Sequence, residues 1–559
     1  MDIETRPGLR LEITGRELTG GLGTTAPHGR PYPYLLVVPA VLLLVQLGVP
    51  MVWTFGQAQH ADVPVVGNFH TVLTDPSALR AAWHSVLWVG IALALVGAGY
   101  GIAVLSRHAG KLWRVLLYVL ILPFGVSAVV SGAVFRLVFD PNPERGMASA
   151  LFGGGAVWLG PDLIWWVLAS AFAWSWLGFV VVLFRAGLDA AHGESFRLGR
   201  FTLPRPGPVT AIVVLTVLVA AIRVFDLVVI ATPGSIQDDV DVVGLHWWRM
   251  ASSSADTGGP AALAVLLFGV VGVLSVAGMR AMRAPEQPAR LPAVDLTEER
   301  APRWWSRPLV GGVGLMWLLP VVILVATAFH TPEAAGAAGW WQLADLGLGS
   351  FAAAGATWLW PAVVGSLLIA GLATALVLAA AVPLAYLLTW VFPRRVSRVC
   401  TAVLAILAVA PVQMYAGPLG DVFTGLGLVG ARTPLALVHA AAGLPFATLV
   451  LRTAFLAAPA RDGRPAFDAM WRRGPYRTTL VAVVVLEFIL VWNDFIVGFL
   501  ISGPGTSPLT LLLWGEARQF GTSAGTVAAA AAVSAVIPVV LLLATWRKVV
   551  TGLTGGIAR

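Results

Sequence analysis

Long apolar runs dominate this chain, and they recur with short polar segments between them. A run of about 20 apolar residues is long enough to cross the hydrocarbon core of a bilayer as a helix. The pattern predicts six such helices near 34–55, 83–105, 115–139, 163–184, 208–232 and 260–279. It predicts six more near 309–329, 360–391, 399–419, 434–456, 478–501 and 524–546. The predicted fold is therefore an all-α integral membrane protein with about twelve transmembrane helices.

Polar segments divide the chain into four parts. Residues 1–33 form a tail, 34–283 a first half of six helices, 284–307 a linker, and 308–559 a second half of six helices. The linker contains prolines and acidic residues and has no apolar period, which is typical of a loop. Because six is an even number, both halves enter the membrane in the same sense. The predicted architecture is a parallel repeat.

Composition and charge place the chain in the membrane and give its direction. Hydrophobic residues make up 58% of the sequence and charged residues 11%, against about 25% charged in soluble proteins. If the N-terminus is cytoplasmic, the cytoplasmic segments hold 29 Arg and Lys and the opposite loops hold five. Basic residues mark cytoplasmic loops, so both termini are predicted to be cytoplasmic. The excess of Arg and Lys in the cytoplasmic segments also accounts for the basic pI, so the pI does not indicate nucleic-acid binding.

The two halves are also related by the spacing of their charged residues. Arg185 and Arg452 each end the fourth span of a half. Asp226 follows Arg185 after 41 residues, and Asp494 follows Arg452 after 42. The fifth span of each half is therefore expected to carry an aspartate at a comparable place.

The fifth span of the second half, "LEFILVWNDFIVGFLI" (486–501), carries Glu487, Asn493 and Asp494. An ionised carboxylate near the bilayer centre costs about 2.5–3.5 kcal/mol on insertion scales. Such groups must therefore be paired or line a wet cavity. Glu487 and Asp494 are seven residues apart, which is two helical turns and hence one face.

The fifth span of the first half, "AAIRVFDLVVIAT", carries Arg223 and Asp226 three residues apart, again on one face. We interpret both sets, with Trp492 beside them, as the lining of a substrate pathway between the halves. Two alternatives stay open. Arg223 pairs with Asp226 or Glu487 and only pins helices together, or the aspartates are solvated charges at helix ends.

Several stretches together resemble the two permease subunits of maltose-type ABC importers, fused head to tail. In the first half they are "FHTVLTDPSALRAAWHSVLWV" (69–89), "TLPRPGP" (202–208) and "VFDLVVIATPG" (224–234). In the second half they are "LPFATLVLRTAF" (444–455), "VWNDFIVGFLISGPGTSPLTLLL" (491–513) and "IPVVLLLATWRKVVTGLTGG" (537–556). The order of these motifs carries the resemblance, which covers nearly the whole chain.

This resemblance implies a bacterial plasma-membrane permease for a sugar or sugar-like solute. It implies an extracytoplasmic solute-binding lipoprotein and two ATPase subunits, or an ATPase homodimer, as partners. The chain has no Walker A sequence, so ATP is expected to be used by the partners, and no cofactor is expected in this chain. No nucleophile, base and orienting group can be assembled from the sequence, and the nine histidines lack metal-ligand spacing. We therefore expect no catalytic residue and no metal site, and contacts with membrane lipid but not nucleic acid.

The sequence departs from this family in the loops between the fourth and fifth spans. Family permeases carry an "EAA…DGA" pattern there, whose short helix docks on the ATPase. Here the loops are "DAAHGESFRLGRFTLPRP" (189–206) and "AAPARDGRPAFDAMWRRGPYR" (457–477), and the glutamate of the pattern is missing from both. The candidate coupling residues that remain are Gly193, Glu194, Asp462, Gly463, Phe467, Met470 and Trp471.

The spacing of Phe467, Met470 and Trp471 gives an apolar helical face flanked by charge. Such a face suits either docking on an ATPase or lying at the membrane interface. The shortened loops leave two other classes of function open. One is an ion-coupled secondary transporter or an uncoupled permease relic, and the other is a membrane scaffold.

The predicted direction can be tested by thiol labelling in intact cells. On a Cys400→Ala background, a cysteine introduced in 330–357 should react with a membrane-impermeant thiol reagent, because this loop is predicted to be extracytoplasmic. A cysteine in 284–307 should not react. Labelling of the linker from outside would contradict both the direction and the parallel repeat.

Overall fold

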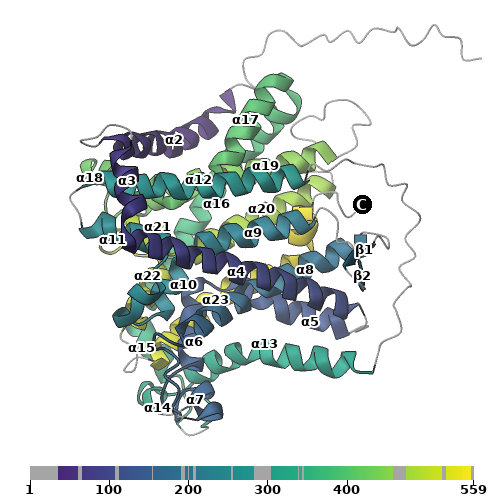
Figure 1. The fold of residues 1–559 in the computed structure, drawn as a ribbon, viewed down its shortest axis with the longest axis vertical. Coiled ribbons are helices and arrows are strands. Elements are labelled where there is room, and N and C mark those ends of the chain that lie inside the picture. The colour runs from purple at the N-terminus through teal and green to yellow at the C-terminus, as the bar shows by residue number, and fades with distance from the viewer. Residues whose placement is uncertain are drawn as a thin grey trace, which may run out of the picture.

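The computed structural model describes residues 35–60, 66–107, 112–153, 155–190, 195–198, 201–204, 209–253, 256–282, 304–337, 339–342, 345–457, 474–518 and 524–554. Helices make up nearly all of these residues (Figure 1). Nine of the described helices are long and apolar enough to cross a membrane. The predicted span 115–139 contains a pair of apolar helices bent by 106°, which has the geometry of a broken span or of a re-entrant loop. The prediction of an all-α membrane protein is confirmed.

The first half contains four long helices. They are α2 (Val38–Gln59), α4 (Pro76–Ser106), α8 (Ile164–Ala190) and α12 (Gly258–Met282). Its shorter elements are α3 (Gly67–Thr74), α5 (Leu112–Ile121), η1 (Leu122–Gly125), α6 (Ala128–Val138), α7 (Met147–Phe152), β1 (Ser195–Leu198), β2 (Phe201–Pro204), α9 (Val209–Ile222), α10 (Asp226–Ala231), η2 (Gly234–Val240) and α11 (Val243–Ser253).

The second half contains five long helices. They are α13 (Ser306–Ala328), α16 (Leu359–Trp390), α19 (Arg432–Ala457), α20 (Gly474–Asn493) and α23 (Ala524–Thr554). Its shorter elements are α14 (Pro332–Ala337), α15 (Gly349–Thr357), α17 (Arg394–Leu407), η3 (Val412–Met414), α18 (Ala416–Gly425), α21 (Ile496–Ile501) and α22 (Leu509–Ala517).

Besides the bent pair within 115–139, three predicted spans are not single helices. The span near 208–232 is divided into α9 and α10, the one near 478–501 into α20 and α21, and the one near 399–419 into α17, η3 and α18. Hydropathy reports only how apolar a stretch is, so it does not detect a break in an apolar stretch. The predicted number of crossings therefore exceeds the number of unbroken helices.

The first helix of each half packs against the other half. Helix α2 contacts α16, α18 and α19, while α13 contacts α5 and α6. In Figure 1, α2 and α13 lie at opposite edges of the bundle, with α4, α8, α9 and α12 between them. Because α2 packs on the second half and α13 packs on the first, the two halves contact each other at both edges. Their central helices share one core.

The first loop after a fourth span forms a β-hairpin, which the sequence analysis did not predict. Strands β1 and β2 pair antiparallel, with Ser195 opposite Pro204 and Leu198 opposite Phe201. In the sequence, apolar residues alternate with polar ones on both sides of Gly199 and Arg200. Such alternation around a short glycine-containing turn favours a hairpin over a helix.

Close helix packing at α8 depends on a residue without a side chain. Gly178 in α8 lies so close to the backbone carbonyl of Leu120 in α5 that an added Cβ would overlap it. Gly178→Ala should therefore lower the free energy of unfolding by about 1–3 kcal/mol, the usual cost of overpacking a core. Thermal unfolding of the purified chain in detergent would measure this change.

Gly101 in α4 is the matched control, because an added Cβ there meets nothing within 4 Å. Gly101→Ala should leave the melting temperature unchanged or raise it slightly, since alanine favours helix. An equal effect of the two substitutions would contradict the close-packing explanation.

Candidate functional site

The predicted fifth span of each half is broken into two helices. Helix α9 ends at Ile222 and α10 begins at Asp226, while α20 ends at Asn493 and α21 begins at Ile496. With 14 residues and a rise of about 1.5 Å per residue, α9 is too short to cross a core of about 30 Å. The first-half span therefore continues past the break into α10, and backbone groups opened inside a bilayer need protein partners.

Side chains satisfy the backbone at the second-half break. The Asp494 carboxylate accepts a hydrogen bond of 2.9 Å from the backbone N–H of Val497 in the first turn of α21. The Thr510 hydroxyl donates a bond of 2.5 Å to the backbone carbonyl of Asp494. The first contact gives an N–H of the first turn an acceptor, as a capping side chain does, although the N-cap residue itself is Phe495. Together the two bonds cover backbone groups where the chain leaves the helix.

The two breaks meet through their aromatic residues. The rings of Phe225 and Phe495 stack with centroids 6.3 Å apart and an interplanar angle of 28°. Phe499 lies 5.9 Å from Phe225 and 5.2 Å from Phe495. We call Arg223, Phe225, Asp226, Asp494 and Phe495 the helix-break site.

The helix starts at this site give a different residue offset between the two halves from the one given by the charged residues. Helices α10 and α21 begin 270 residues apart, as do Phe225 and Phe495. The charge spacing instead matched Asp226 with Asp494, which are 268 apart. In the structure Asp226 is the first residue of α10, whereas Asp494 precedes α21 by two residues. The aspartates therefore reach the site from different positions along their spans.

Three of the predicted pathway residues come together at this site. Arg223 is exposed at the break and interacts electrostatically with Asp226, Asp494 and Tyr415. The Nε2 atom of His439 in α19 lies 3.8 Å from a carboxylate oxygen of Asp494. Charged groups from both halves thus lie within electrostatic range of one another at the two breaks, although no ion pair joins Arg223 to either aspartate among the described residues.

The sequence analysis missed Tyr415 and His439, which are both buried. A histidine inside the apolar run 434–456 was an available signal. Tyr415 gave no signal, because a tyrosine in an apolar run is compatible with ordinary packing.

Glu487 does not join the helix-break site. Its side chain is 2% exposed and lies against Gly443 of α19, where an added Cβ would overlap it. Among the described residues, no ion pair links Glu487 to Arg223, and its Oε1 atom has no hydrogen-bond partner. The structure therefore gives no support to a pairing of Glu487 with Arg223.

Trp492 and Asn493 serve contacts between helices. Trp492 is buried, and its indole N–H donates a 3.0 Å bond to the backbone carbonyl of Ser534 in α23. The Asn493 side-chain amide donates a 3.0 Å bond to the backbone carbonyl of Gly125 in η1. Asn493 thereby ties the second-half break to the bend between α5 and α6 of the first half.

The predicted coupling residues lie outside the described residues. They are Gly193, Glu194, Asp462, Gly463, Phe467, Met470 and Trp471.

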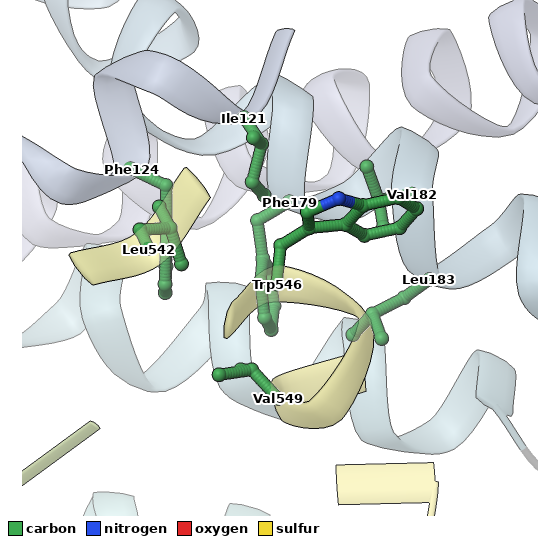
Figure 2. A pocket seen from close by; sticks show the side chains of 8 residues that line it. All are labelled: Ile121, Phe124, Phe179, Val182, Leu183, Leu542, Trp546 and Val549. Atoms are coloured by element: carbon green, nitrogen blue, oxygen red, sulfur yellow. The ribbon is translucent and has the colours of Figure 1, made fainter. Parts of the chain in front are cut away.

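The helix-break site combines hydrogen-bond donors, acceptors and aromatic surface. A guanidinium donates, carboxylates accept, and a phenol or a neutral imidazole can do both. A pocket between α8 and α23, shown in Figure 2, has a different character, because apolar side chains surround it. Its lining is Ile121, Phe124, Phe179, Val182, Leu183, Leu542, Trp546 and Val549. A polar solute fits the chemistry of the first place and not of the second.

Comparisons with known proteins identify what these broken spans belong to. The chain is 24% identical over 274 residues to the trehalose/maltose transport system permease protein MalF of Thermococcus litoralis. The match covers 43% of this chain and 89% of that protein. It is 26% identical over 284 residues to the osmoprotective compounds uptake permease protein GgtD of Synechocystis, covering 46% of this chain and 94% of the relative. The chain is a permease component of an ABC importer.

A further relative is the alpha-glucoside transport system permease protein AglG of Rhizobium meliloti. It is 30% identical over 190 residues, which cover 31% of the permease and 49% of AglG. A bacterial ABC transporter involved in the import of the acidic polysaccharide alginate has a solved structure with 17% identity and a TM-score of 0.39, covering 45% of the permease and 94% of that chain. No family model matches the permease.

Less than half of the permease covers nearly all of MalF or GgtD. A chain of 559 residues thus has room for two permease units, which fits the two halves. It is a multi-pass plasma-membrane protein and a transport subunit.

The cap at Asp494 predicts a difference between two substitutions. Asp494→Ala removes the acceptor for the Val497 N–H and should lower the free energy of unfolding by about 1 kcal/mol. Asp494→Asn keeps an acceptor oxygen in the same place and should lose much less. Asp421→Ala, at an exposed position of α18, is the control. Equal melting temperatures for both Asp494 variants would show that the cap does not contribute.

Proposed function

We propose that the permease moves a hydroxyl-rich solute, a sugar or sugar-like molecule, from an extracytoplasmic binding protein across the plasma membrane into the cytoplasm. The observation that carries this proposal is the meeting of the two broken fifth spans at Arg223, Asp226 and Asp494. Sugar hydroxyls need both donors and acceptors along their route, and the helix-break site supplies both. The stacked Phe225 and Phe495 add flat apolar surface beside these groups.

The names of the relatives support this class of solute. MalF is a permease of a trehalose/maltose transport system, and AglG of an alpha-glucoside transport system. GgtD is a permease for the uptake of osmoprotective compounds. We assign the permease a small neutral solute of this chemistry.

The proposal includes the partners and the source of energy. The permease has no ATPase motif of its own, so two ATPase subunits or a homodimer power it from the cytoplasm, and it holds no cofactor. A solute-binding lipoprotein delivers the solute on the other side. Both termini lie in the cytoplasm, and the loops 189–206 and 457–477 are where the ATPases act.

Reconstitution tests the function and the pathway together. The full-length permease, with the ATPase and binding protein that co-purify with it, should take up radiolabelled trehalose or maltose into proteoliposomes only when ATP is present. Asp494→Asn should lower uptake about tenfold, the effect of losing one charged hydrogen-bond acceptor. Its level in the membrane should stay close to wild type, because the amide still caps α21.

Asp421→Asn removes an exposed carboxylate of the same half and should transport normally. Uptake that continues without ATP and stops with a protonophore would replace the proposal with an ion-coupled transporter. Normal uptake by Asp494→Asn would remove the helix-break site from the pathway.

A further inference from the structure

The fourth span of the first half ends in a chain of hydrogen bonds that reaches the second span. Arg185, near the end of α8, donates from NH1 to the hydroxyl oxygen of Ser106 at 3.2 Å. That hydroxyl in turn donates a 2.6 Å bond to the backbone carbonyl of Ala103 in the last turn of α4. The guanidinium of α8 is thereby linked through one serine to the end of α4.

The second half contains the same chain of bonds. Arg452, near the end of α19, donates from NH2 to the hydroxyl oxygen of Ser397 at 3.3 Å. The Ser397 hydroxyl donates a 2.6 Å bond to the backbone carbonyl of Leu388 in the last turn of α16. We call these two chains, Arg185–Ser106–Ala103 and Arg452–Ser397–Leu388, the serine relays.

The serine relays are built from different places in the sequence. Ser106 is the last residue of α4 itself, three residues after Ala103. Ser397 lies in α17, nine residues after Leu388 and beyond the end of α16. The feature that the halves share is therefore the spatial arrangement, in which one arginine reaches one helix end through one hydroxyl.

Both relays end on groups that need a partner. The last four carbonyls of a helix have no intrahelical donor, and Ala103 and Leu388 belong to these sets in α4 and α16. Ser106 and Ser397 are 2% and 5% exposed, so water does not easily replace the serine bond. A cation near the helix C-terminus also interacts favourably with the helix dipole.

The relays differ in how much else holds the arginine. Arg185 also donates from Nε to the carboxylate of Asp189 at 2.9 and 3.0 Å, and its guanidinium lies 5.4 Å from the ring of Trp113. Within the described residues, the Nε of Arg452 has no hydrogen-bond partner. Among the described residues, Arg185 therefore has contacts beyond its serine that have no counterpart at the Nε of Arg452.

We infer that Arg185 and Arg452 are positioning residues for transport, which hold the cytoplasmic end of the fourth span to the end of the second span in each half. This inference rests on the proposed function, in which the ATPases act on the loops that follow α8 and α19. Because the relay makes the two helix ends one unit, a displacement of the fourth span carries the second span with it. A permease without the relay binds its ATPase but transmits the movement poorly.

A first experiment tests the relay without transport. Hydrogen–deuterium exchange of the full-length permease in nanodiscs should show the last turns of α16 and α19 exchanging about tenfold faster in Ser397→Ala than in wild type, because a bond to a charged group is lost. Ser397→Thr keeps a hydroxyl and should restore the wild-type rate. Thr389→Ala is the matched control, since Thr389 donates only to Ala385 within α16.

A second experiment separates positioning from a merely structural role. In the ATPase complex in proteoliposomes, Ser397→Ala and Arg452→Gln should keep ATP hydrolysis within about twofold of wild type and lower trehalose or maltose uptake about tenfold. Ser106→Ala should have a smaller effect, because Asp189 and Trp113 still hold Arg185. Arg395→Gln, which removes an exposed arginine near Ser397, should behave like wild type.

The outcomes distinguish this inference from the proposed function. If the wild-type complex shows no ATP-dependent uptake, the proposed function fails, while the exchange rates still report on the relay. If wild type transports and the Ser397 and Arg452 variants keep its ratio of uptake to hydrolysis, the positioning role is wrong. Unchanged exchange in Ser397→Ala would show that the relay does not hold the helix ends together.

Discussion

A backbone group inside the bilayer must find its partner within the protein, and the arrangement of this permease follows from that constraint. A span can break only where other groups cover the open backbone. At the second-half break, Thr510 and the carboxylate of Asp494 provide that cover. Phe225 and Phe495 then bring the two breaks together. The polar groups at the two breaks are therefore covered by residues of both halves.

The contacts between the halves follow the same rule, because several are side-chain bonds to backbone carbonyls. Thr54 of α2 donates to Met414 at 2.9 Å, and Trp174 of α8 donates to Trp317 of α13 at 2.9 Å. Arg136 of α6 donates to carbonyls at the ends of α10 in its own half and α22 in the other. Backbone carbonyls, some near helix ends and that of Trp317 inside α13, thus become contact points between helices. The packing of α2 and α13 on opposite halves places these contact points on both sides of the shared core.

The sequence predicted the membrane fold and the two-half organisation, because both depend on quantities that a sequence states directly. Apolar run length gave the crossings, and charge spacing gave Arg185 and Arg452, which make matching contacts in the structure. The breaks were not predicted, because the polar residues at them, among them Arg223 and Asp494, were interpreted as side chains on one face of a continuous helix. The β-hairpin was readable from alternation around Gly199, but the loop was compared with a helical motif instead.

At the candidate site, helical periodicity does not predict side-chain positions beyond the end of a helix. Glu487 and Asp494 are two turns apart, which places both on one face only while the helix continues. Helix α20 ends at Asn493, one residue before Asp494, so the second carboxylate lies beyond the helix end. There it accepts a bond from the Val497 N–H of α21 and lies 3.8 Å from His439 of α19, while Glu487 lies against Gly443 of the same helix. A single helix end thus gives different surroundings to two carboxylates that the sequence grouped together, with Asp494 at the helix-break site and Glu487 packed between helices.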